Sequence, residues 1–118
     1  MSTVKDAADA LLASLVPVEQ VRRYADPGAV VDPPGVVLGA PALTWGTGCA
    51  DPTEARWLVY LVVAASDRAL EELWELLPIV VAALDSVPGA AVIRADPGAY
   101  LAGGPELPCY EIQVDYGL

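Results

Sequence analysis

The sequence predicts an α+β domain in which an antiparallel or mixed β-sheet carries two main helices on one face. Two stretches, residues 3–15 and 66–87, have apolar residues at helical spacing. The other patterned runs are rich in β-branched residues and are separated by turns containing Pro and Gly. A chain of 118 residues is long enough for one core, so we expect residues 1–118 to form a single domain.

The first two elements are a helix and a short strand. The helix is predicted over residues 3–15, where Ser2 or Thr3 can cap its first turn and Pro17 ends the pattern. The strand is predicted over 21–25, and the turn-rich segment after it favours a place near the sheet edge. Its adjacent arginines are either an anion contact or, as we interpret them, a solvated strand end.

A hairpin follows, with "GVVLGAPALTWG" and "EARWLVYLVVAA" as its two runs and "GTGCADPT" as its loop. Gly39 and Pro41 interrupt the first run, which predicts a bulge or bend and an arm that extends beyond the sheet. The second run is apolar on both faces. Because two helices can cover only one face, this run favours contact with another subunit.

The clearest helix is predicted over residues 66–87, capped by Ser66 or Asp67. Pro78 lies inside it and removes one backbone hydrogen bond, so a kinked but continuous helix is expected. Its apolar stripe, which we assign to the core, contains Leu70, Leu73, Trp74, Leu77, Val80, Val81 and Leu84.

Two strands complete the chain, "AAVIRA" and "CYEIQVDYG". The last one alternates, and its inward residues are predicted to be Tyr110, Ile112, Val114 and Tyr116. The outward residues Glu111, Gln113 and Asp115 form an acidic row on the other face.

The overall charge excludes one class of function. Six basic and sixteen acidic residues give a net charge of −10 and a pI near 4.1, which disfavours binding of nucleic acid through counterion release. Such a surface is still compatible with DNA that slides past without sticking. Hydrophobic residues make up 55% of the chain, more than one small core can hide, so part of the apolar surface is expected to face a partner.

The residues that most enzymes need are missing. The chain has no histidine, and its two cysteines, Cys49 and Cys109, lack metal-ligand spacing and are interpreted as structural thiols. The Gly-rich segments lack the signatures of phosphate-binding loops, and the loop acids Asp51 and Glu54 are interpreted as solvated. We therefore expect no enzymatic activity, no metal and no cofactor. The sequence has no apolar run long enough to predict a membrane span, and none that predicts a secretory signal. Synthesis in the cytoplasm is therefore expected.

Three segments together resemble a known family: "PGVVLGAPALTW", "ARWLVYLVVAASDRALEELWELLPIVVAAL" and "AVIRADPGAYLAGGPELPCYEIQV". They are similar to the tail terminator proteins of long-tailed (siphovirus-type) phages of actinobacteria, over about residues 34–116. The resemblance implies a compact α+β subunit of the virion tail. It implies a homo-oligomeric ring, commonly hexameric, that caps the tail tube protein and joins it to the head connector or stopper protein. DNA passes through such a ring without specific binding, and no membrane is involved.

Two sets of residues are candidates for this role. Subunit contacts are predicted for the hairpin, at Val37, Leu38, Leu43, Trp45 and Trp57, although both tryptophans also fit a core position. Channel-facing positions are predicted for Glu111, Gln113 and Asp115, with the acids of the helix at 66–87 as the other choice. Two alternative functions stay open: another neck, head-completion or tail-tube-related ring protein, and a cytosolic regulatory module whose "PGAYLAGGPELP" loop binds a small ligand.

Overall fold

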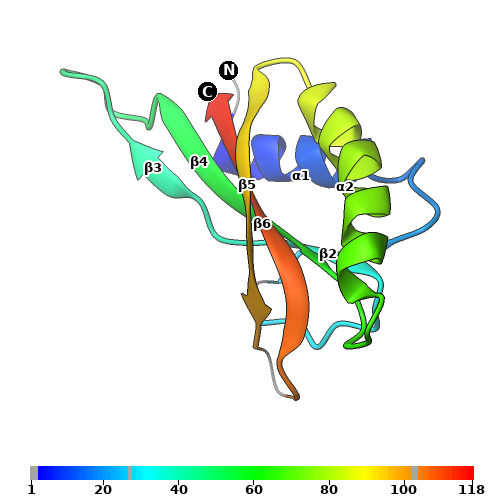
Figure 1. The fold of residues 1–118 in the computed structure, drawn as a ribbon. Coiled ribbons are helices and arrows are strands. Elements are labelled where there is room, and N and C mark those ends of the chain that lie inside the picture. Colours follow the sequence, from blue (N-terminus) through cyan, green and yellow to red (C-terminus); the bar gives the residue numbers. More distant parts are fainter. Residues whose placement is uncertain (1–2, 27, 102–103) are drawn as a thin grey trace.

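The computed structural model describes residues 3–26, 28–101 and 104–118 (Figure 1). Two helices and six strands follow one another along this part of the chain. In order they are α1 (Val4–Ser14), β1 (Arg22–Tyr24), β2 (Gly35–Leu38), β3 (Ala42–Thr44), β4 (Glu54–Val62), α2 (Ala69–Asp85), β5 (Ala90–Tyr100) and β6 (Leu107–Gly117).

All six strands belong to one mixed sheet with the order β1-β2-β4-β6-β5, and β3 also pairs with β4. The pair β1 and β2 is parallel, and the other pairs are antiparallel. The prediction of an α+β fold with an antiparallel or mixed sheet is thereby confirmed.

Both helices pack on the same face of this sheet. Ala7 and Leu11 of α1 and Leu73 and Val80 of α2 belong to one buried cluster with the alternate residues of the central strands. The sheet residues of this main core include Trp57, Val59, Leu61, Ile112 and Val114. The start of α1 is fixed by a capping box, in which the Thr3 hydroxyl accepts from the Asp6 amide and the Asp6 carboxylate accepts from the Thr3 amide.

The opposite face of the sheet, called here the helix-free face, has a second and smaller core. Val37, Val62 and Cys109 point to this face and are covered by Val31 and Tyr100, which come from a loop and from the end of β5. The chain itself therefore covers the Val62 end of the second face of β4, whereas Leu58 on the same face is 38% exposed. The contact of this face with another subunit stays a prediction.

Helix α2 is continuous through Pro78, as predicted. Its buried residues are Ala69, Leu73, Leu76, Val80 and Leu84. The assignment of Leu70 and Trp74 to the core is wrong, because the Trp74 side chain is 55% exposed and Leu70 is also exposed. Both lie about 60–120° around the helix from the line that touches the sheet, since consecutive residues are rotated by about 100°.

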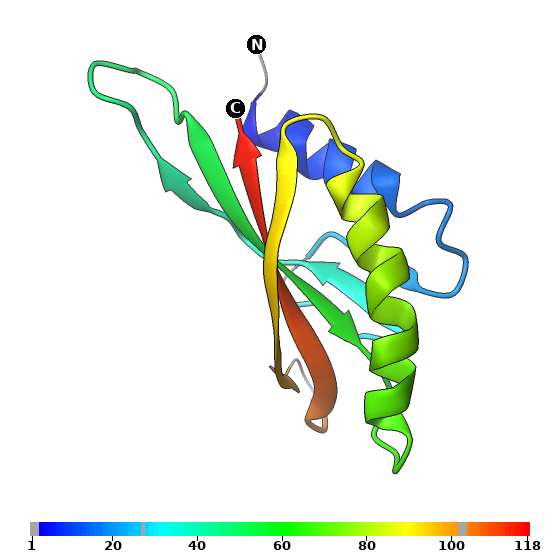
Figure 2. The same cartoon turned by 45° about the horizontal axis from the view of Figure 1, so that its top comes forward.

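The predicted bend at Gly39 and Pro41 separates β2 from β3, and both strands pair with β4. At Gly39 the backbone of the bend lies close to the backbone of β4. The Gly39 amide donates to the Leu58 carbonyl at 2.8 Å. A Cβ atom at this position would stand 2.7 Å from that same oxygen. Beyond the bend, β3, the following loop and the start of β4 leave the body of the molecule as a projecting arm (Figure 2), defined here as residues 42–56.

Strands β5 and β6 are longer than predicted and pair with each other antiparallel. Pro97 is tolerated inside β5 because this strand is an edge of the sheet, where one side of the backbone has no partner strand. The last strand alternates as predicted, with Ile112, Val114 and Tyr116 buried on the helix-covered face.

Candidate interaction surfaces

The five predicted contact residues of the hairpin separate into buried and exposed groups. Val37 and Leu38 are buried in β2, and Trp57 is only 3% exposed in the main core. These three side chains stabilise the subunit and offer no surface to a neighbour. Leu43 is half-buried, and Trp45 is 52% exposed. The contact hypothesis therefore narrows to Trp45 and the arm around it.

The tip of the arm is residues 45–50, "WGTGCA", which carry no charge. The arm is closed by backbone bonds: the Thr53 amide donates to the Thr44 carbonyl at 2.8 Å, and the Cys49 amide donates to the Gly46 carbonyl at 3.1 Å. Gly48 adopts φ +78°, a turn conformation that favours glycine. These bonds close the loop of the arm, which extends away from the body of the molecule (Figures 1 and 2).

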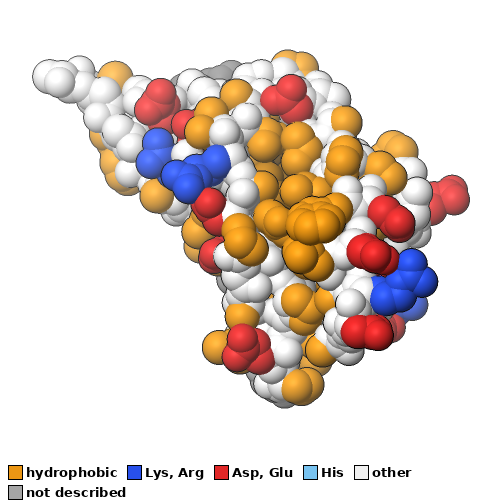
Figure 3. All heavy atoms as spheres, viewed as in Figure 1, with side chains coloured by type: hydrophobic (Ala, Val, Ile, Leu, Met, Phe, Trp, Pro, Cys, Tyr) orange, Lys and Arg blue, Asp and Glu red, His pale blue; other side chains and the backbone are white. Residues whose placement is uncertain are grey.

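A second apolar surface, which the sequence analysis missed, lies beside α2. We call it the α2 patch and define it by Leu70, Trp74, Leu77, Val81 and Tyr110. Hydrophobic side chains gather on this side of the molecule in the strip between α2 and β5 (Figure 3). The Trp74 indole N–H donates to the Tyr110 hydroxyl at 3.0 Å, which fixes the ring across the strip.

A signal for this patch was present in the sequence. At about 100° per residue, the predicted apolar stripe of α2 together with Leu76 covers an arc of about 160°, whereas contact with one sheet needs about 100°. The half of the arc that contains Leu73 and Val80 is buried, and the half that contains Trp74 and Val81 borders solvent. A helix with such a wide apolar arc has more apolar surface than its own sheet covers.

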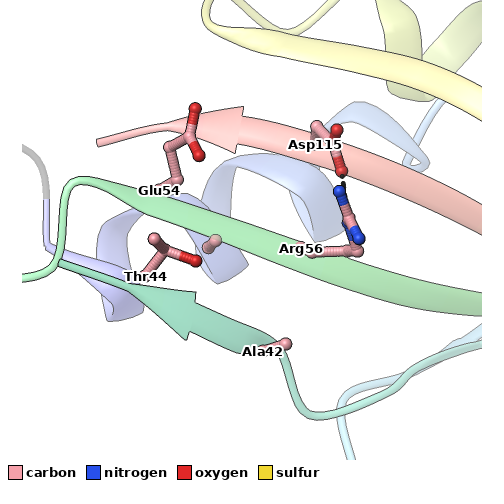
Figure 4. A pocket seen from close by; sticks show the side chains of 6 residues that line it. Ala42, Thr44, Glu54, Arg56 and Asp115 are labelled. Atoms are coloured by element: carbon pink, nitrogen blue, oxygen red, sulfur yellow. Dashed lines mark hydrogen bonds and ion pairs between the residues drawn. The ribbon is translucent and has the colours of Figure 1, made fainter. Parts of the chain in front are cut away.

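The predicted channel-facing residues Glu111, Gln113 and Asp115 lie together on the helix-free face, each half-buried. The row is less acidic than predicted, because the Arg56 guanidinium donates to the Asp115 carboxylate at 3.0 Å. Figure 4 shows this pair beside Glu54 and Thr44, where the strands β3, β4 and β6 enclose a shallow pocket of about 130 Å³.

Most basic side chains are already neutralised within the subunit. Of the six, five form ion pairs with acids, and the sixth, Arg23, donates to the Leu12 carbonyl at 3.4 Å. All sixteen acids lie in the described part of the chain, and five are taken by these pairs, so eleven have no basic partner. The chain therefore has many more carboxylates than the basic side chains of its described residues neutralise.

Of the loop that the ligand-binding alternative invokes, residues 97–108, positions 102 and 103 lie outside the described residues. Two surface pockets that share Tyr100 border the described part of this loop, one of about 300 Å³ and one of about 210 Å³. The first contains Tyr60 and Glu111, and the second is lined by apolar side chains including Val31 and Leu107. Cys109 lies beneath them, and burial, with a smaller effect of Glu111, raises the pKa of its thiol to about 11. This thiol is protonated at neutral pH.

The described residues include no group of three or more His, Cys, Asp or Glu side chains placed to hold a metal ion. Cys49 is an exposed thiol on the arm, far in sequence from the buried Cys109, and both are free. Arg22, one of the two adjacent arginines, is paired with Asp32. Within the described ranges, no helix has the length and hydropathy required to span a membrane.

Two comparisons with known proteins identify no relative of this chain. A scan against protein-family models gives no match, and a search of curated proteins gives none either.

Proposed function

We propose that this protein is a structural subunit of a phage tail terminator ring. In this role several copies cap the completed tail tube, join it to the head connector and leave a central passage for DNA. The proposal includes no enzymatic step, metal or cofactor. It places the protein in the virion, at the junction of head and tail, after synthesis in the host cytoplasm.

One observation carries the proposal: the stretch that resembles tail terminators, residues 34–116, is one continuous structural unit. It contains the strands β2 to β6 and helix α2, which together supply most of the main core. Only α1 and β1 lie outside it. The likeness in sequence thus follows five of the six strands of the sheet together with α2.

The distribution of apolar surface supports assembly into a ring. Trp45 and Trp74 are both more than half exposed, although tryptophan is highly buried on average in folded proteins. They lie on different parts of the molecule, one on the arm and one on α2. Large exposed aromatics of this kind anchor contacts between proteins.

The charge supports a passage for DNA and favours one of the two candidate linings. On the helix-free face, Asp115 is paired with Arg56, while Glu111 has no basic partner among the described residues. On α2, Glu72 and Glu75 have no ion pair within the described part of the chain, and neither has Asp67, which precedes the helix. We therefore propose that the acids of α2 line the passage, where they repel the phosphate backbone and keep DNA mobile.

The oligomeric state tests the proposal first. Native mass spectrometry and negative-stain imaging at high protein concentration are expected to show closed rings. Tail tubes assembled without a terminator are expected to bind the protein at one end and to stop growing. A strictly monomeric protein that does not bind tubes contradicts the proposal, and rings that bind only the connector favour another neck protein.

The ligand-binding module is the second candidate, favoured by the two pockets that meet at Tyr100. A small molecule held there would contact Tyr60 and the end of β5. Its test is thermal unfolding in the presence of a metabolite panel, because a ligand that binds only the folded state raises Tm. A compound that raises Tm in the wild type and not in Tyr60→Ala would favour this function over the ring.

A further inference from the structure

We infer that the arm of one copy docks its tip, residues 45–50, onto the α2 patch of a second copy. The inference rests on the ring subunit proposed above and identifies the two surfaces that join neighbours. The contact is head-to-tail, since each copy uses its arm on one side and its α2 patch on the other.

The arm is unable to reach the α2 patch of its own chain. Both views of the fold place the arm and α2 at opposite sides of the molecule, with the arm directed away from the body (Figures 1 and 2). The chain measures 51 Å along its longest axis and 27 Å along the next, so it is extended rather than round. A contact between these surfaces therefore joins two molecules.

Repulsion between the carboxylates of two copies favours a contact through the same two surfaces. Each subunit has a net charge of −10, and eleven of its carboxylates have no basic partner in the described structure. Like charges brought together at a protein interface cost several kcal/mol. The arm tip has no charged residue, and neither do the side chains of the α2 patch. Two copies can join these surfaces without placing carboxylate against carboxylate.

The chemistry of the two surfaces also matches. Trp45 is a large apolar group at the narrow end of the arm, and the α2 patch presents an indole and a phenol ring between aliphatic side chains. Aromatic rings pack against one another in tilted or offset arrangements and exclude water from the contact. Contacts of this type usually contain the few residues that dominate binding, among which Trp and Tyr are enriched.

The first experiment compares Trp45→Ala and Trp74→Ala with the wild-type protein by native mass spectrometry. Each variant is expected to lower the fraction of assembled protein at least tenfold and to keep the wild-type circular dichroism spectrum, since both side chains are more than half exposed. Val30→Ala is the matched control, because Val30 is 69% exposed and lies outside both surfaces. It is expected to assemble like the wild type.

The second experiment mixes the two variants. A Trp74→Ala chain keeps an intact arm, and a Trp45→Ala chain keeps an intact α2 patch, so one sound contact can form between them. A head-to-tail interface therefore predicts a heterodimer and nothing larger. Closed rings in the mixture, or no species above the monomer, would overturn the inference.

A cross-link supplies an independent measurement. Cys49 at the arm tip is exposed and Cys109 is buried, so a short thiol-reactive cross-linker reaches only Cys49 in the wild type. In the Leu70→Cys variant it is expected to join the arm tip of one chain to α2 of the next and to produce a covalent ladder. Val16→Cys, at an exposed position outside the α2 patch, is expected to produce none.

The outcomes separate this inference from the proposed function. If both tryptophan variants still form rings and no ladder appears, the docking inference is wrong and the ring function stands. If the wild type stays monomeric at every concentration and does not cap tubes, the ring function itself is wrong.

Discussion

The two faces of the sheet are covered in different ways. The helix-covered face lies under α1 and α2 and contains the main core, which extends from Leu11 through Trp57 to Ile112. The helix-free face has five buried side chains at one end and a surface of ion pairs, such as that of Arg56 with Asp115, at the other. Helices cover the first face. A loop residue, the end of β5 and ion pairs between side chains cover the second.

This difference shows where surplus apolar surface collects. On the helix-free face, where the sequence predicts a partner, Val31 and Tyr100 cover Val62, and Leu58 is 38% exposed. Large exposed hydrophobic side chains also include Trp45 at the arm tip and Leu70 and Trp74 on α2. The two tryptophans at these exposed positions are thus separate from Trp57, which belongs to the main core.

The largest difference in stability is expected between truncating a tryptophan of the main core and truncating the tryptophan of the arm tip. Trp57→Ala empties a fully packed position in the main core and is expected to lower the free energy of unfolding by about 3–5 kcal/mol. Trp45→Ala, at an exposed position, is expected to lower it by less than about 1 kcal/mol. Urea unfolding followed by circular dichroism measures both values.

A conservative variant of Trp57 serves as a control for the Trp57→Ala measurement. The indole N–H of Trp57 is buried and has no hydrogen-bond partner among the described residues. Trp57→Phe removes this unsatisfied donor and keeps most of the ring, so it is expected to cost far less than Trp57→Ala. Equal losses for Trp57→Ala and Trp45→Ala would contradict the division into core and contact residues.

The second prediction concerns the junction between the body and the arm. Gly39→Ala places a methyl group 2.7 Å from the Leu58 carbonyl oxygen, so either the Leu58 backbone or the bend must move. The expected loss is about 1–3 kcal/mol of unfolding free energy, as for other overpacked sites. Gly117→Ala is the control, since nothing lies within 4 Å of its added Cβ. If Gly39→Ala leaves the free energy of unfolding unchanged, the junction between body and arm accommodates the methyl group at no cost in stability.

The third prediction tests the small core of the helix-free face by pH. The pKa of Cys109 is raised from 9.0 to about 11, mainly by burial, and the pKa values of Tyr60 and Tyr100 are raised in the same direction. The folded state therefore holds these protons more tightly than the unfolded state. The contribution of Cys109 to stability is complete below about pH 9 and is lost as the pH rises through about 11, and the contribution of the two tyrosines is also lost as the pH rises.

The measurement for this prediction is the slope of Tm against pH between about 9 and 11. Cys109→Ala removes the thiol and is expected to flatten the slope, with the part due to the tyrosines remaining. Cys49→Ala, which removes the exposed thiol, is expected to keep the wild-type slope. Identical slopes in wild type and Cys109→Ala would mean that the thiol is not linked to folding.

Much of the fold could be predicted because its local signals agree. The caps and periodicity of residues 3–15, the interruption at Gly39 and the alternation from Tyr110 to Tyr116 each identified an element correctly. In all three, backbone preference and apolar spacing indicate the same structure. The extra length of β5 was missed because Pro97 and Gly98 suggest a turn, and only pairing with β6 makes them part of an edge strand.

The candidate surfaces were harder to predict, because they depend on which neighbours lie nearby in space. Trp74 looked like a core residue since it continues the apolar stripe of α2, yet the sheet contact runs along Leu73, Leu76 and Val80. Asp115 looked like part of an acidic row, but Arg56, 59 residues away in sequence, neutralises it across two paired strands. Periodicity indicates which side of an element is apolar and not how far its neighbour extends.

The smallest expected effect concerns the hydrogen bond that orients Trp74 in the α2 patch. Tyr110→Phe removes the hydroxyl that accepts from the Trp74 indole N–H, and water can replace it because Trp74 is half exposed. We expect a loss of about 0.5–1 kcal/mol in unfolding free energy, together with weaker assembly. Tyr24→Phe, which removes the acceptor for the Asp32 amide elsewhere, is expected to cost a similar amount and leave assembly unchanged. Equal assembly of the two variants would show that the orientation of Trp74 has no part in the contact.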